Sequence, residues 1–252
     1  MLRDLTKSEW QELLNIPDDQ IPVALILRGT RDLKGHYNQM QDLFSDILTI
    51  GDSNTVVDDV FIGQLNDMPV AYASVYGAPM ASEITHVFGA LGTRFVLQIG
   101  CCGALSGALS YGDLIAASAA YCGEGAAQYY KNDGKTVEAS IVISEAPTYE
   151  NGESVPIHRG QLYTTSALFA ESHEDIARWN AQGFIAVDME TAATFAVAEH
   201  FGMERASLLY VYDCPSQGEN IFLSACNADE RRLIGNECMI ALALDTVKEQ
   251  CR

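Results

Sequence analysis

The chain has 252 residues, of which 48% are hydrophobic, and its formal net charge at pH 7 is −19. This size and hydrophobic content suffice for one large α/β domain, whereas the negative charge repels nucleic acids and anionic membranes. No apolar run approaches the roughly 20 residues that a membrane span needs. We therefore expect a small, neutral ligand and neither a nucleic-acid nor a membrane partner.

The seven cysteines are odd in number and lack the paired spacing of metal ligands. No apolar signal segment opens the chain, so we expect reduced thiols and a cytoplasmic location. The five histidines also lack metal-ligand spacing, and we interpret them as surface or packing residues. The sequence thus predicts neither a metal site nor a resident cofactor.

The first half of the chain alternates helical and extended patterns. Thr6 and Glu9 have the spacing of a capping box, which predicts a short helix through residue 14. We expect residues 1–20 to form an N-terminal helical appendage to a main domain of residues 21–252. The next expected elements are a strand at 23–27, a helix at 37–47, strands at 56–65 and 69–76, a helix at 82–91 and a strand at 95–99.

The second half continues the alternation without repeats or a dividing linker. We expect a strand at 113–118, a turn at 131–134, a long polar loop at 146–159, a strand at 184–187, a helix ending before Gly202, a strand at 207–213 and a helix at 229–248. The polar loop has the composition of a lid. Alternating strands and helices predict a single α/β domain.

Two carboxylates stand where the strand at 184–187 gives way to a helix. Asp188 and Glu190 follow this apolar run directly, and ligands of open α/β sheets collect outside the carboxyl ends of strands. An aspartate at the start of a helix also caps it, so a structural role for Asp188 is the alternative.

Two further strand ends carry polar or glycine-rich positions. The strand at 95–99 runs into Gly100 and Gly103, a spacing that predicts a turn in which the backbone approaches a ligand closely. The strand at 207–213 delivers Asp213, for which the alternative is the start of a turn before Pro215. Together the three strand ends predict one ligand-binding site.

These motifs, in their order and spacing, resemble the nucleoside phosphorylase superfamily, which comprises purine nucleoside phosphorylases, uridine phosphorylases and related nucleosidases. The resemblance covers about residues 23–247. It implies a single α/β domain with a central mixed, partly barrel-like sheet flanked by helices. It also implies a homo-oligomer with active sites shared between subunits.

The resemblance further implies cleavage of the bond between ribose and base, which builds positive charge on the sugar and negative charge on the base. Asp213 would protonate the purine with support from Arg231, and Glu190 would hold the ribose hydroxyls above Met189. The other nucleoside-binding residues implied are Cys102, Gly103, Asp188 and Phe169, with Leu168 as the alternative to Phe169. Pyrimidine substrates are disfavoured, because the glutamine and arginine pair of uridine-specific members is not found.

The phosphate site departs from the family pattern. Gly29 occupies the expected strand-end position, but Gln98 stands where the family has an arginine and Cys101 where it has a serine. Exchanging a charged contact for a neutral one costs about 1 to 3 kcal/mol of phosphate affinity. The cations expected to compensate are Arg28, Arg31 and Lys34.

Three functions therefore remain open. Phosphorolysis of a purine nucleoside to free base and ribose 1-phosphate, with phosphate as co-substrate, is favoured by the cations near Gly29 and by backbone N–H groups between Gly100 and Gly103. Hydrolysis by a phosphate-independent nucleosidase is the close alternative. A nucleoside-binding protein without catalysis is the alternative from another class.

Overall fold

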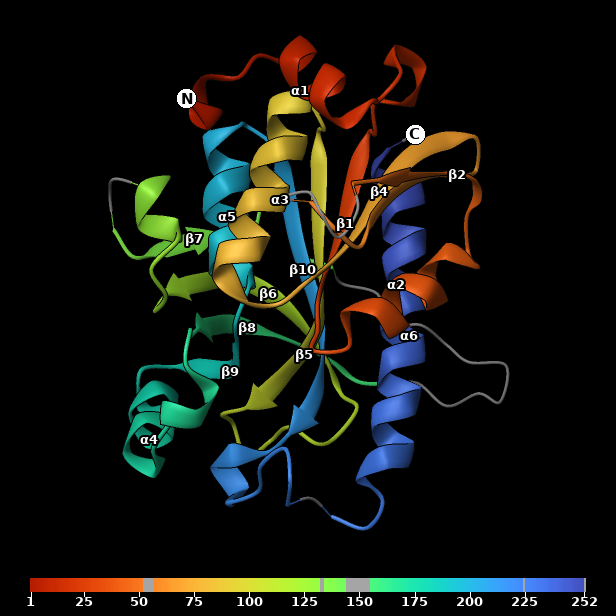
Figure 1. Cartoon of the computed structure of the whole chain (residues 1–252). Coiled ribbons are helices and arrows are strands. Elements are labelled where there is room, and N and C mark those ends of the chain that lie inside the picture. The colour runs from red at the N-terminus through yellow and green to blue at the C-terminus, as the bar shows by residue number, and fades with distance from the viewer. Residues whose placement is uncertain (52–56, 132–133, 144–154, 224, 252) are drawn as a thin grey trace.

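One mixed β-sheet runs through the molecule in the computed structural model, which describes residues 1–51, 57–131, 134–143, 155–223 and 225–251 (Figure 1). The strands are β1 (Ala24–Gly29), β2 (Ser45–Ile50), β3 (Val60–Leu65), β4 (Met68–Val75), β5 (Phe95–Ala104), β6 (Leu114–Cys122), β7 (Thr136–Glu138), β8 (Ile157–Thr164), β9 (Phe184–Asp188) and β10 (Glu204–Asp213). The helices are α1 (Lys7–Leu14), α2 (Leu33–Gln41), α3 (Gly77–Leu91), α4 (His173–Ala181), α5 (Thr191–His200) and α6 (Ala228–Gln250).

Part of the sheet closes into a barrel. The strand order is β10-β6-β8-β9-β5-β1-β4-β3-β2, and β10 also pairs with β5. The strands β5, β9, β8, β6 and β10 therefore form a closed ring, from which β1 to β4 extend as an open sheet. This confirms the predicted fold class, a mixed and partly barrel-like sheet flanked by helices.

The helices cover the two faces of the sheet separately. Because neighbouring residues of a strand point to opposite faces, Ile26 packs with Met239 of α6 whereas Leu25 packs with Phe88 of α3. Figure 1 shows α6 along one side of the sheet and α3 with α5 along the other. Helix α6 also contacts the ends of β1 and β5, since Arg28 of β1 donates to Asn236 and the Gly100 backbone N–H of β5 donates to the Met239 sulfur at 3.3 Å.

The N-terminal segment packs on the main domain. The Thr6 side chain accepts a hydrogen bond from the Glu9 backbone at 3.3 Å, and the Glu9 carboxylate accepts one from the Thr6 backbone at 2.7 Å, which confirms the capping box. Trp10 is buried in the cluster that includes Phe88 of α3. The division of the chain near residue 20 stays a prediction.

Several expected segments differ from the structure or lie outside the described residues. The helix predicted at 37–47 is α2, which begins at Leu33 because Asp32 accepts the Gly35 backbone N–H at 3.0 Å, and strand β2 follows it. The polar loop predicted at 146–159 lies mostly outside the described residues, as does part of the turn at 131–134. The end of that predicted loop belongs to β8, which pairs in parallel with β6.

The turn predicted between Gly100 and Gly103 is wrong, because β5 continues through Ala104. Gly100 has φ +150°, and a Cβ at this position would lie 2.6 Å from the carbonyl oxygen of Gly29. Glycine is thus needed for the close approach of β5 to β1. The contact brings Gly29 and Gly100 together at the carboxyl end of the sheet.

We predict that Gly100→Ala lowers the free energy of unfolding by about 2 kcal/mol or more, since the new methyl group collides with rigid backbone of β1. Urea unfolding followed by circular dichroism measures this loss. Gly107→Ala is the matched control, because a Cβ there meets no atom within 4 Å. Equal stabilities of the two variants would contradict the packing argument.

Candidate functional site

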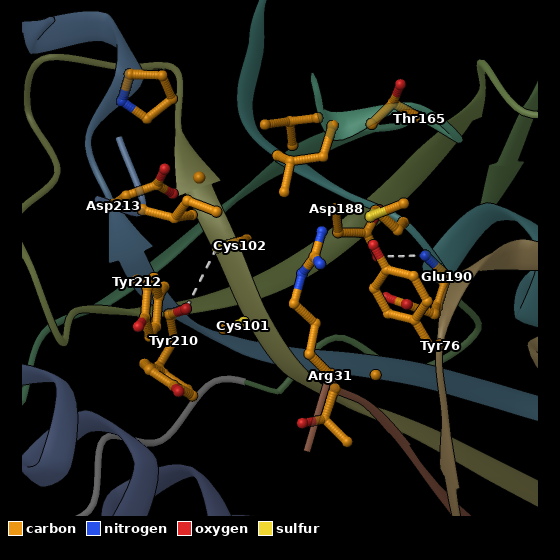
Figure 2. A pocket seen from close by; sticks show the side chains of 18 of the residues that line it. Arg31, Tyr76, Cys101, Cys102, Thr165, Asp188, Glu190, Tyr210, Tyr212 and Asp213 are labelled. Carbon is orange, nitrogen blue, oxygen red and sulfur yellow. Dashed lines mark hydrogen bonds between the residues drawn. The ribbon is translucent and has the colours of Figure 1, made fainter. Parts of the chain in front are cut away.

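A cavity of about 420 Å³ lies at the carboxyl ends of β1, β5, β9 and β10. Figure 2 shows Asp213 on one side of β5 and the pair Asp188 and Glu190 on the other, with Arg31 reaching between them. The three strand ends singled out in the sequence therefore meet at one place. The predicted residues that line the cavity are Gly29, Arg31, Cys101, Cys102, Gly103, Asp188, Met189, Glu190 and Asp213.

Asp188 fixes the start of α5. Its carboxylate accepts hydrogen bonds from the Thr164 hydroxyl at 2.6 Å and from the backbone N–H groups of Thr191 at 2.7 Å and Glu190 at 3.3 Å. Burial raises the pKa of Asp188 in spite of these bonds. Asp188 lines the cavity, but its hydrogen bonds agree with the alternative that it caps the following helix. The same bonds orient Glu190.

Glu190 is only 6% exposed, and its Oε1 accepts the Gly77 backbone N–H at 2.7 Å. Burial, and then the nearby charge of Asp188, raise the pKa of Glu190 to about 8. The carboxyl also lies so close to Gly29 that a Cβ there would collide with it. Glu190 therefore holds a proton near neutral pH and sits against the end of β1.

Asp213 ends β10 on the opposite wall and is 8% exposed. Burial raises the pKa of Asp213 to about 6, against the opposing effect of the Arg232 charge. A carboxyl group with a pKa near the working pH is suited to donate a proton to a departing group. The position and the pKa of Asp213 thus fit a general acid.

The arginine that affects Asp213 is Arg232, whereas Arg231 was predicted to support it. Arg231 is 44% exposed, lies 3.9 Å from Asp113 and does not line the cavity. Arg232 is buried, donates to the Tyr212 carbonyl at 2.6 Å and lies over the Tyr212 ring. Successive residues of a helix point about 100° apart, so only one of the two can face β10.

The wall between the acids is formed by β5 and by the short 3-10 helix η4 (Leu168–Ala170). Cys102 is buried, with its Sγ 3.6 Å from the Tyr210 carbonyl, and Gly103 leaves room for Asp213. Leu168 lines the cavity, whereas Phe169 is 77% exposed and lines only an adjoining groove. The structure thus places the alternative, Leu168, where Phe169 was expected.

Some of the residues predicted to bind phosphate line the cavity, and others form contacts elsewhere in the protein. Arg28 is 1% exposed, donates a hydrogen bond to Asn236 of α6 and does not line the cavity. Lys34 pairs with Asp59 at 3.1 Å, outside the cavity. Arg31 does line it, with its guanidinium 4.9 Å from the ring centre of Tyr76. Arg31 is the one lysine or arginine among the described residues that line the cavity.

Gln98 and Cys101 offer little to an anion. Gln98 is fully buried and bonded on both sides, since its Oε1 accepts from Thr194 at 3.1 Å and its Nε2 donates to the Ile99 carbonyl at 3.1 Å. Burial raises the pKa of the Cys101 thiol to about 12, so this group stays neutral. The carboxyl groups that line the cavity are those of Asp32, Glu171, Asp188, Glu190 and Asp213.

His36 and Glu171 are among the polar residues lining the cavity that sequence reasoning missed. His36, interpreted as a surface or packing residue, has its Nδ1 2.7 Å from the Thr30 hydroxyl, and burial lowers its pKa to about 4. Glu171, between η4 and α4, lines the same cavity. Neither residue follows a strand end in the sequence, so no local pattern singled them out.

Among the described residues, no group of three or more histidine, cysteine, aspartate or glutamate side chains has the arrangement of a metal site. Within the same part of the chain, no helix is both long and apolar enough to cross a bilayer. The predicted sharing of the site between subunits concerns a second chain and stays a prediction.

Residues 49–233 match the model of the phosphorylase superfamily. The chain belongs to this superfamily. It is 25% identical over 242 residues to a DeoD-type purine nucleoside phosphorylase of Clostridium beijerinckii, covering 94% of this chain and 92% of that protein. It is 27% identical over 136 residues to a guanosine phosphorylase of Halorubrum lacusprofundi, covering 54% of this chain and 56% of that protein.

The fold has a close counterpart among solved structures. The uridine phosphorylase of Vibrio fischeri ES114 superposes with a TM-score of 0.73 at 21% sequence identity, covering 91% of this chain and 93% of that one. At this identity the likeness establishes the shared fold.

We predict that Glu190→Gln stabilises the protein increasingly as the pH rises. The raised pKa of Glu190 means that the folded state binds more protons than the unfolded state between about pH 4.5 and 8, so this group lowers stability as the pH climbs through that interval. The variant should exceed the wild type by up to a few kcal/mol near pH 8.5 and much less at pH 5.

Thermal unfolding from pH 5 to 8.5 measures this difference. Glu83→Gln on α3 is the control, because it also removes one negative charge but from an exposed position. A difference between wild type and Glu190→Gln that stays constant over this range would show that Glu190 is ionised in the folded protein.

Proposed function

We propose that this protein cleaves the N-glycosidic bond of a purine nucleoside and releases the free base. The observation that carries the proposal is that Glu190 and Asp213, two buried carboxyl groups with raised pKa values, line one cavity from opposite sides of β5. The relatives named as purine nucleoside and guanosine phosphorylases support a purine. A nucleoside-binding protein without catalysis has no need for two acids of raised pKa.

Asp213 would act as the general acid. Bond cleavage leaves negative charge on the base, and a proton donated to the purine ring neutralises it. The pKa of about 6 keeps part of the Asp213 population protonated near neutrality, and the apolar neighbours Leu168 and Pro215 limit competition from water. The charge of Arg232 then favours the ionised form of Asp213 after the transfer.

Glu190 would hold the ribose and stabilise the cationic sugar. Hydrogen bonds from the vicinal hydroxyls favour the charged form of a carboxyl group, so substrate binding lowers the pKa of Glu190. Its negative charge then lies beside the sugar carbon on which positive charge develops. The Gly77 backbone N–H holds the carboxyl in place during this step, and Asp188 holds the Glu190 backbone N–H.

The acceptor of the sugar is proposed to be phosphate, giving ribose 1-phosphate, with Arg31 as the cation that binds it. Hydrolysis is the second candidate, and one observation favours it. Of the side chains expected to hold phosphate, Arg28, Lys34 and Gln98 do not line the cavity, whereas five carboxyl groups do. An acidic cavity lowers the affinity for a phosphate dianion.

We predict that Asp213→Asn lowers kcat/KM for adenosine and inosine by about 10² to 10⁴, since the proton donor is lost. 7-Methylguanosine already carries positive charge at the ring nitrogen, so its cleavage should be far less affected. Chromatographic measurement of the released base checks both substrates. Equal losses for both would assign Asp213 to binding or folding instead of proton transfer.

We predict that Arg31→Ala raises the KM for phosphate about tenfold or more while the KM for the nucleoside changes little, because a charged contact to the anion is removed. Lys34→Ala is the matched control, since Lys34 is a nearby cation that pairs with Asp59 outside the cavity.

Product analysis in buffers with and without phosphate decides between the two acceptors. Phosphorolysis gives ribose 1-phosphate and stops when phosphate is removed. Free ribose released at an unchanged rate without phosphate would establish hydrolysis as the reaction and leave Arg31 without the proposed role.

A further inference from the structure

A groove of about 470 Å³ continues the cavity at one end. It is lined by the start of α4 and by the segment that follows β10, which includes the short 3-10 helix η5 (Pro215–Gln217). The two hollows share six lining residues, namely Leu168, Glu171, Asp213, Pro215, Ile221 and Phe222. A ligand bound in the cavity can therefore reach the groove.

The groove adjoins the part of the cavity that the proposed function assigns to the base. Asp213, which would protonate the purine, lines both hollows. Glu190 and Arg31, which would hold the ribose and the phosphate, line only the cavity. The part of a nucleoside that lies nearest to the groove is therefore the base and not the sugar.

Large apolar side chains from three segments line the groove. Phe169 belongs to η4, Ile176 belongs to α4, and Phe222 follows η5. Phe169 is 77% exposed and Phe222 is 78% exposed, although covering aromatic side chains of this size is favourable in free energy. Exposed apolar groups that line a groove beside a cavity are typical of a ligand-binding surface.

The charged groups of the groove disfavour an anionic ligand. The carboxyl groups that line it are those of Glu171, Glu174, Asp213 and Glu219. In the part of the chain that the structure describes, no lysine or arginine lines the groove, and the histidine that lines it is His173. Negative charge on a ligand would face these carboxyl groups without a lysine or arginine to compensate. The groove thus suits an uncharged, apolar group.

We propose that the groove is a subsite for an alkyl or aryl substituent on the amino group at C6 of the purine. This inference rests on the proposed function, which places Asp213 at the ring nitrogen N7. The substituents that flank N7 are those at C6 and C8, and C8 lies between N7 and N9, the atom that carries the sugar. Since the residues proposed to hold the sugar do not line the groove, C6 is the position that fits. The substrate class is therefore that of 6-alkylamino- and 6-arylalkylaminopurine nucleosides.

The test compares adenosine with N6-benzyladenosine, whose benzyl group probes the groove. In the wild type, kcat/KM for N6-benzyladenosine should be at least equal to that for adenosine. In Phe222→Ala this ratio should fall about tenfold, because the benzyl group loses an aromatic contact. Leu223→Ala is the matched control and should keep the wild-type ratio, since Leu223 is the next residue, is also exposed and lines neither hollow.

A second variant and a third nucleoside test the apolar character of the subsite. Phe169→Ala should lower the same ratio, because Phe169 lines the groove from another segment. N6-(4-carboxybenzyl)adenosine differs from N6-benzyladenosine by one negative charge, and its kcat/KM in the wild type should be several-fold lower. Glu174→Gln should reduce this difference, since Glu174 lines only the groove.

Three results would overturn the assignment. The first is a ratio for N6-benzyladenosine over adenosine that stays unchanged in Phe222→Ala or falls equally in Leu223→Ala. The second is equal cleavage of the neutral and the carboxylated benzyl nucleosides by the wild type. The third is faster cleavage of 8-benzylaminoadenosine than of N6-benzyladenosine, which would place the substituent at C8.

Failure of the proposed function would be visible separately, as an absence of base release from every nucleoside tested with the wild type. Calorimetry with free adenine and free N6-benzyladenine then decides the inference on its own. Tighter binding of N6-benzyladenine that Phe222→Ala weakens and Leu223→Ala preserves would support the subsite. Equal binding of the two bases, or an advantage of N6-benzyladenine that survives in Phe222→Ala, would refute it.

Discussion

Strand β5 belongs to the open sheet and to the closed barrel at once, and the rest of the site depends on this double pairing. Residues 95–100 pair with β1, residues 95–103 pair with β10, and residues 103–104 pair with β9. Three strand ends are thereby brought around Cys101, Cys102 and Gly103. The close approach of Gly100 to the Gly29 carbonyl permits this arrangement. It sets Glu190 and Asp213 on opposite sides of one strand.

The acidic groups at this place are maintained at a cost to stability. Glu190, Asp213 and Glu171 all have raised pKa values, and burial is the main cause each time. A buried carboxyl group lowers the free energy of unfolding once the pH exceeds its unfolded pKa. Several carboxyl groups with raised pKa values in one cavity indicate a functional site, because they do not stabilise the packing of the protein.

The arginines illustrate how this chain differs from the pattern that its superfamily resemblance implies. Arg28 points to α6 and donates to Asn236, and Arg232 lies behind Asp213 over the Tyr212 ring. Arg31 alone of the described cations faces the cavity, stacked near Tyr76 and Phe169. Near the site, Arg28 and Arg232 thus bond within the protein, and only Arg31 of the described arginines lines the cavity. This distribution makes the acceptor of the sugar the most informative property to measure.

The sequence by itself determined the α/β class, most strands and helices, and the two strand ends that carry Asp188, Glu190 and Asp213, because apolar periodicity and strand-end chemistry are local properties. Only the tertiary structure decided which neighbouring side chain faces the cavity, as with Arg232 against Arg231 and Leu168 against Phe169. It also decided that Gly100 serves a strand contact and that Glu171 lines the same cavity as Asp213. Such choices depend on the direction of each side chain and on the closure of β10 against β5, which are long-range properties that no sequence window contains.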